Sequence, residues 1–332
     1  MKTALAFLLG VALAGVAFLL FLNANDDTER LVSDQKPVLG ETITVTVYSS
    51  SNDNGREAIE ATFSRAAELE SIVSSADPKS ALTRLNEESH LASAPTELLD
   101  MLELALLVHR ISSGALDVTA EPLRLLWATA ANEQLQTASV VAALQRVGMH
   151  RIYVGGGRAP SISLIPGTTI GLHGIERAYA VDQMIDVLRS RGVSVAAIES
   201  AGLFRAIGSP PDNEGRGWAV RTGEIAACTG DAACAFAHLG WARETPRMER
   251  SEELVVDPRT GYPIPSPPQV IVYAPTCAEA RALACALQVM QPEPAIALID
   301  SLGSTEARIV SSDDPAASWQ SRGLDDLPDS AR

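Results

Sequence analysis

The spacing of apolar residues along the chain alternates between two periods, which predicts a mixture of strands and helices. Every second position over 42–48 is apolar and the segment is rich in β-branched residues, so it is predicted as a strand with one buried face. An apolar period of three to four residues predicts a helix over 57–73. The same reasoning predicts further helices near 96–107, 137–147, 175–191, 278–290 and 294–302. It predicts further strands near 151–154, 161–164, 193–198, 204–207, 218–221, 270–273 and 306–310.

These elements are mixed along the chain without a repeat or a clean break, which favours one α+β domain over residues 37–310. Thr96 is predicted to cap the helix that follows it, and Gly114 to end that helix. The glycines at 155–157 join two predicted strands. Because Pro160 follows them and no helix opens there, they indicate a hairpin turn rather than a phosphate-binding loop.

The N-terminal segment from Ala4 to Leu22 carries no charge and is long enough to cross a bilayer as a helix. Lys2 precedes this segment, and Asp26 and Asp27 follow it. Because the positively charged flank of a membrane span stays in the cytoplasm, the remaining chain is expected to lie on the periplasmic or extracellular side. The alternatives are a cleaved signal peptide, for which Leu22 makes a poor cleavage site, or a buried helix. We therefore expect an anchor in the cytoplasmic membrane over 1–22, a polar linker over 23–36 and an acidic disordered tail over 311–332.

Composition narrows the function classes. The 332 residues include 26 Lys and Arg against 41 Asp and Glu, a net charge of -15 that argues against a nucleic-acid partner. Four cysteines occur, and Cys228 and Cys234 could close a short loop. Cys277 and Cys285 lie eight residues apart in a predicted helix, about 12 Å, which is too far for a disulfide. Common hydrolase, zinc-protease and Walker motifs are missing from the sequence.

Three polar loops stand beside apolar elements and are the candidate sites. In the first loop, residues 113–119, Asp117 could accept a hydrogen bond from a ligand hydroxyl or imide, or simply cap a turn. The second loop, residues 171–177, enters a helix whose free N–H groups could hold a pyrophosphate, or is an ordinary strand–helix connection. The third loop, residues 257–263, is a dense turn that hairpin chemistry explains equally well.

Together with one further segment, these loops resemble the motifs of the FAD:protein FMN transferases, the ApbE-type flavin transferases of bacterial envelopes. The resemblance runs in family order from about Leu39 to about Val310. The segments that carry it are Ala76–Ser80 with Arg84–Asn86, Ser113–Trp127, Gly171–Asp182 and Asp257–Pro263.

This resemblance implies a T-fold-like α+β domain that binds FAD between two halves. It implies a Mg²⁺ ion at the pyrophosphate and transfer of FMN to a Thr hydroxyl of an acceptor flavoprotein in the envelope. Gly174 would supply a backbone carbonyl to the metal ion, and Asp257 is the candidate for proton transfer. The implied FAD-binding residues are Ala115, Leu116, Asp117, Gly171, Arg177 and Val256.

The sequence departs from the family pattern where the chemistry is expected. Gly171 stands for an Asp, His173 for a Gly, Arg177 for a Lys, and Leu254 for the His that precedes the third loop. Segments 201–203 and 228–231 also differ from the family's Gly-Gly-Asp and Thr-Ser-Gly-Asp.

On the helix that carries metal ligands in the family, Arg281 stands for an Asp and Cys285 for a Thr. A unit charge at 4 Å is worth about 4 kcal/mol at an effective dielectric of about 20, so an arginine there disfavours Mg²⁺ strongly. Arg281 could instead bind the pyrophosphate itself, or pair with an acid such as Glu279. The sequence therefore leaves two interpretations open: a transferase with an altered site, or a non-catalytic homologue that binds flavin or a partner.

Overall fold

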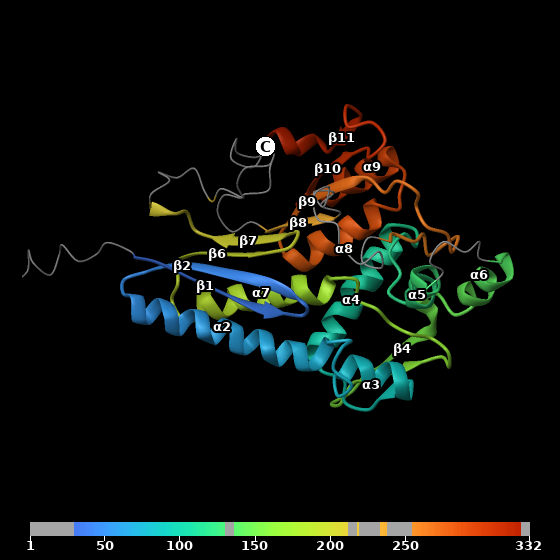
Figure 1. Ribbon diagram of the computed structural model, residues 1–332, viewed down its shortest axis with the longest axis horizontal. Helices are drawn as coiled ribbons and strands as arrows, with labels where there is room; N and C mark the ends of the chain where they lie inside the picture. The colour runs from blue at the N-terminus through green and yellow to red at the C-terminus, as the bar shows by residue number, and fades with distance from the viewer. Residues whose placement is uncertain (1–29, 130–135, 212–217, 219–232, 238–253, 327–332) are drawn as a thin grey trace, which may run out of the picture.

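The computed structural model describes residues 30–129, 136–211, 218, 233–237 and 254–326 (Figure 1). Its helices are α2 (Asn52–Val73), α3 (Ala81–Glu88), α4 (Thr96–Ile111), α5 (Glu121–Thr129), α6 (Thr137–Leu144), α7 (Ile175–Ser190), α8 (Cys277–Leu287) and α9 (Pro292–Leu302). Its strands are β1 (Arg30–Val38), β2 (Glu41–Ser49), β3 (His90–Leu91), β4 (Ile152–Gly155), β5 (Ser161–Leu164), β6 (Val195–Ser200), β7 (Leu203–Ile207), β8 (Ala233–Ala237), β9 (Gln269–Ala274), β10 (Glu306–Val310) and β11 (Ser318–Gln320). Short 3-10 helices span Met149–Arg151 and Arg322–Asp326.

The larger sheet is antiparallel and has the strand order β1-β2-β6-β7-β8-β9-β10-β11. The first hairpin turns through Leu39 and Gly40, both with positive φ, as a two-residue connection between twisted strands requires. Helices α2 and α7 pack against each other below β1, β2 and β6, and α8 packs against β8 and β9 (Figure 1). The sheet and helices confirm the α+β prediction.

A small second sheet, β3-β5-β4, lies beside α3. Gly155 ends β4 and pairs with Ser161 of β5, and Gly156 and Gly157 follow in the connection, which confirms the predicted hairpin turn. The helices and strands predicted from apolar spacing are present with boundaries shifted by a few residues, except for 218–221, of which the structure describes Trp218 alone.

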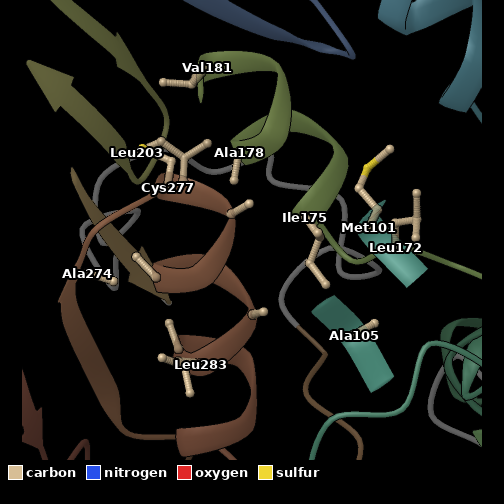
Figure 2. Packing of buried hydrophobic residues seen from close by; sticks show 14 of the residues in the cluster. Met101, Ala105, Leu172, Ile175, Ala178, Val181, Leu203, Ala274, Cys277 and Leu283 are labelled. Atoms are coloured by element: carbon tan, nitrogen blue, oxygen red, sulfur yellow. The ribbon is translucent and has the colours of Figure 1, made fainter. Parts of the chain in front are cut away.

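The main hydrophobic core lies where α4, α7 and α8 meet. Figure 2 shows Leu172 and Ile175, just before and at the start of α7, near Met101 and Ala105 of α4. Each of these four side chains is almost fully buried. Burial of an aliphatic side chain contributes roughly 1.5–3 kcal/mol. The core therefore anchors the loop between Leu172 and Ile175, which carries the second candidate site.

The structure corrects the predicted linker and tail. Residues 30–36, expected in a linker, belong to β1, which lies at the edge of the sheet. Its polar side chains and Pro37 are typical of edge strands, and they hid the apolar alternation by which a strand is predicted. Residues 311–326, expected to be disordered, include β11 and a 3-10 helix with Leu324 buried. Thr96 begins α4 instead of capping it, because Pro95 occupies the N-cap position.

The predicted anchor at residues 4–22 lies outside the described residues, as does residue 228 of the proposed short disulfide loop. Among the helices that the structure does describe, none has the length and apolar character to cross a membrane. Cys277 and Cys285 are both free thiols, in agreement with the helical spacing argument.

Candidate functional site

The first and second loops meet through their backbones. The amide of Gly171 donates to the carbonyl of Val118 over 2.8 Å. Asn86 fixes the chain just before the second loop, because its side chain donates to the Ile170 carbonyl (2.9 Å) and accepts from the Ile170 amide (2.8 Å). Two segments that are far apart in sequence thereby form one side of the candidate site.

Asp117 in the first loop is buried and holds that loop in a tight turn. Its Oδ1 accepts from the amide (2.8 Å) and the hydroxyl (2.5 Å) of Thr119, and that hydroxyl accepts from the Gly148 amide (2.6 Å). His109 reaches back from α4, with Nδ1 2.8 Å from the Leu116 carbonyl and 3.6 Å from Asp117 Oδ2. Asp117 therefore shapes the loop as the capped-turn alternative expected, while its Oδ2 faces a histidine.

The third loop packs against the first loop and α5. Arg259 lies beside Gly114, with its Cγ 3.6 Å from the position that a Cβ there would occupy. The indole of Trp127 donates to the Gly261 carbonyl over 2.8 Å, and its ring lies 5.8 Å from that of Tyr262. The structure therefore brings all three candidate loops together.

Asp257 is engaged by Arg259 through both carboxylate oxygens. Arg259 Nε lies 2.9 Å from Oδ1 and Nη2 lies 2.9 Å from Oδ2, and the hydrogen bond to Asp257 raises the pKa of Arg259. The carboxylate is buried, and it also accepts from the backbone amide of Arg259. In this arrangement Asp257 stabilises the turn, and Leu254, at the implied histidine position, offers no group for proton transfer. Val256 pairs with Pro263 across the turn.

The second loop enters α7 through two consecutive residues in left-handed conformation, His173 (φ 55°) and Gly174 (φ 87°). Glu176 caps this helix, since its carboxylate accepts from the Gly174 amide (2.9 Å). Arg177 lies 3.8 Å from Glu41 of β2. Desolvation lowers the pKa of His173, so its imidazole is neutral near pH 7. The end of α7 that was expected to hold a pyrophosphate thus already carries its own carboxylate.

Arg281 and Cys285, one turn apart on α8, both point at the carbonyl of His173. The Nε of Arg281 donates to this oxygen over 3.2 Å, and the Cys285 thiol lies 3.8 Å from it. A Cβ at position 174 would lie 2.8 Å from Arg281 Nε, so the guanidinium packs directly on the Gly174 backbone.

Gly171, which stands where the family pattern has an Asp, faces a carboxylate from α5. A Cβ at this position would lie 2.5 Å from Glu121 Oε2. Arg124 donates to both oxygens of Glu121, over 3.0 and 2.7 Å. Glu121 therefore fills the space that the side chain of an Asp at position 171 would need.

Asp182 positions α8 relative to α7. This buried carboxylate pairs with Arg205 of β7 and accepts from the backbone amides of Cys277 and Ala278, over 2.9 Å each, at the start of α8. A carboxylate at a helix N-terminus is favoured by the helix dipole. Asp182 therefore sets where Arg281, one turn further along α8, meets the second loop.

Comparison with known proteins identifies the family. The sequence model of the ApbE family matches residues 39–309. The chain belongs to the ApbE family. Two similar curated proteins are named FAD:protein FMN transferase: one from Haemophilus influenzae, 27% identical over 85% of this chain and 87% of its own length, and one from Klebsiella pneumoniae, 26% identical over 73% of each.

Solved structures show the same fold. The apo flavinyl transferase ApbE of Pseudomonas stutzeri superposes with a TM-score of 0.77, covering 92% of this chain and 98% of its own at 22% identity. The flavin transferase ApbE of Vibrio cholerae superposes with a TM-score of 0.75, covering 90% and 99% at 22% identity. The ApbE-like fold predicted from the motif order is therefore confirmed.

The Mg²⁺ ion implied by this ApbE resemblance does not fit the residues that the structure describes around the second loop and α8. The carbonyl of Gly174 accepts the helical hydrogen bond from Ala178 (3.1 Å), and the guanidinium of Arg281 lies against the same backbone. No group of three or more His, Cys, Asp or Glu side chains within the described ranges is arranged to hold a metal ion. A divalent ion beside Arg281 would meet a repulsion of about 4 kcal/mol for each of its charges at 4 Å.

Sequence reasoning missed three site residues in this ApbE-family chain: Glu121, Arg124 and His109. They reach the site from α5 and α4, and none belongs to the three loops. One signal was available for Glu121, since a glycine in place of an acid at position 171 leaves a space that a neighbour must fill.

Proposed function

We propose that this ApbE-family chain is an FAD:protein FMN transferase. The observation that carries the proposal is the convergence of the three motif-bearing loops through direct contacts, on a fold that matches ApbE structures over nine-tenths of the chain. The names of its curated relatives support the same activity.

In this reaction the hydroxyl oxygen of an acceptor threonine attacks the phosphorus of the FMN half of FAD. A new phosphoester bond forms, the bond to the AMP half of the pyrophosphate breaks, and AMP leaves. The hydroxyl proton passes to a base. Leu254 cannot take this proton, and Arg259 binds both carboxylate oxygens of Asp257, so neither residue is placed to act as that base in this arrangement.

The residues implied by the resemblance divide into three groups for holding FAD. Ala115, Leu116 and Asp117 form a rigid backbone turn against which a planar ring system can pack. Gly171 and Val256 contribute backbone from the other two loops. Arg177 supplies positive charge near the start of α7, where phosphate groups gain from a cation. FAD is thus the substrate, and the acceptor flavoprotein is the partner.

A second candidate is a homologue that binds FAD without transferring FMN. Two residues favour this candidate. Arg281 of α8 lies against the second loop where the family pattern implies an acidic metal ligand, and Leu254 stands where the pattern implies a histidine.

One experiment separates these candidates. The purified full-length chain is incubated with FAD and an acceptor protein carrying the family's target threonine motif, and the acceptor is examined by mass spectrometry. Transfer predicts a covalent FMN adduct that is missing when the threonine is replaced by valine. If FAD binds but no adduct forms, the second candidate is supported. If FAD does not bind and no adduct forms, both candidates are refuted.

We further propose that residues 4–22 anchor the chain in the cytoplasmic membrane with the domain on the outer side, where it meets an envelope acceptor. The uncharged segment and the flanking charges support this arrangement. Protease added to intact spheroplasts should digest the domain. Protection of the domain would place it on the cytoplasmic side instead.

A further inference from the structure

The second loop and α8 hold a fixed cation where a divalent ion would be expected. Arg281 is anchored through Nε to the His173 carbonyl (3.2 Å), and the thiol of Cys285 lies 3.8 Å from the same oxygen. The anchor is part of the folded core, because Leu172 and Ile175 on either side of this loop are buried (Figure 2).

The backbone at position 174 is suited to this guanidinium. Gly174 has φ 87°, and a Cβ there would lie 2.8 Å from Nε, 3.1 Å from Nη2 and 3.2 Å from Cζ of Arg281. Any other residue at 174 would push the guanidinium away. The glycine and the arginine therefore form one unit, and that unit excludes a metal ion.

The carboxylates around this unit are already bound by donors. Arg124 donates to both oxygens of Glu121, and the Gly174 amide donates to Glu176. Both acids and both arginines, Arg124 and Arg281, lie close enough to His173 to act on its ring electrostatically. The local chemistry is that of an organised set of ion pairs and not of a free carboxylate cluster that attracts a divalent cation.

We propose that the guanidinium of Arg281 binds the pyrophosphate of FAD in place of a divalent metal ion, so that this chain binds FAD without a metal. The planar fork of arginine matches phosphate oxygens and keeps its charge at all physiological pH values. The proposal rests on the proposed function, because it assigns a binding role at the same site.

The test measures FAD affinity of the full-length chain by quenching of flavin fluorescence, with excess EDTA and with excess Mg²⁺. The Kd for FAD is expected to agree within about twofold between the EDTA and Mg²⁺ conditions. A true dependence on the metal would change the Kd about tenfold or more, which corresponds to about 1.4 kcal/mol. Loss of FAD binding in EDTA, restored by Mg²⁺, would overturn the proposal.

Variants locate the cation. Arg281→Gln removes the charge and is expected to weaken FAD binding about tenfold or more, while riboflavin, which has no phosphate, binds unchanged. Arg322→Gln is the matched control, since its side chain is 90% exposed on the C-terminal 3-10 helix. Unchanged FAD affinity in Arg281→Gln would contradict the proposal.

A further variant tests for a gain of metal dependence, so that the proposal does not depend only on the weaker FAD binding of Arg281→Gln. Arg281→Asp places a carboxylate beside the His173 carbonyl and is expected to make FAD binding depend on Mg²⁺. Circular dichroism confirms that each variant is folded, and Arg281→Lys, which keeps the charge without the fork, should fall between wild type and Arg281→Gln. Failure of the folded wild-type chain to bind FAD in either condition would refute the proposed function itself.

Discussion

Removing the carboxylate of Asp182 is expected to destabilise the fold strongly, because this group is buried and bound by donors from two elements. Its side chain is 11% exposed and that of its partner, Arg205, is 8% exposed. Asp182→Ala would leave a buried guanidinium without this partner, a loss of about 3–5 kcal/mol. It would also remove the acceptor for the amides of Cys277 and Ala278 at the start of α8, about 1 kcal/mol more.

The assay is urea denaturation of the full-length chain, followed by circular dichroism. Asp182→Ala is expected to lower the free energy of unfolding by about 5 kcal/mol, the sum of the two losses. The matched control is Asp186→Ala, one turn further along α7, whose side chain is 59% exposed and pairs with Arg189 at 3.4 Å. That change should lower stability by less than about 0.5 kcal/mol.

The same variant tests how α8 is positioned. Because Asp182 fixes the first turn of α8, its loss is expected to weaken FAD binding as well, through displacement of Arg281 in the following turn. A loss of stability below about 1 kcal/mol, or one equal to that of Asp186→Ala, would show that the reasoning about this ion pair is wrong.

Two further predictions concern the second loop. Gly174→Ala should cost about 1–2 kcal/mol of backbone strain and also displace Arg281, so FAD affinity falls. Gly192→Ala is the control, since Gly192 has φ 78° and open space around it. This change should lower the free energy of unfolding by a similar amount but leave FAD affinity unchanged. Equal FAD affinities of the two variants would contradict the contact between Gly174 and Arg281. Asn86→Ala should lower the unfolding free energy by about 1–3 kcal/mol, measured by urea denaturation, because both backbone groups of buried Ile170 lose their partner; an unchanged midpoint would refute this role.

The sequence predicted most of the fold because burial leaves a clear period in the central elements. Strand β2 is buried on one face along its length, and its alternation was visible without a structure. Strand β1 and the end of the chain were misjudged for the opposite reason. They form or cover sheet edges, and β1 carries polar side chains there because an apolar exposed edge would pair with other molecules.

The candidate site was predicted in part. Motif order identified the three loops, and the structure shows them in contact. What the sequence could not provide was the set of contacts around each replaced position. Glu121 reaches Gly171 from a helix 50 residues earlier in the chain, and the guanidinium of Arg281 settles on Gly174 from a helix more than 100 residues later. Such pairings depend on tertiary packing, which no local pattern encodes.

The most direct measurement is a crystal structure of the chain grown with FAD and Mn²⁺, with anomalous diffraction used to locate the metal. We expect FAD phosphate oxygens within hydrogen-bond distance of the Arg281 guanidinium and no anomalous peak between α8 and the second loop. A Mn²⁺ peak there, with Arg281 turned away from the phosphates, would contradict it.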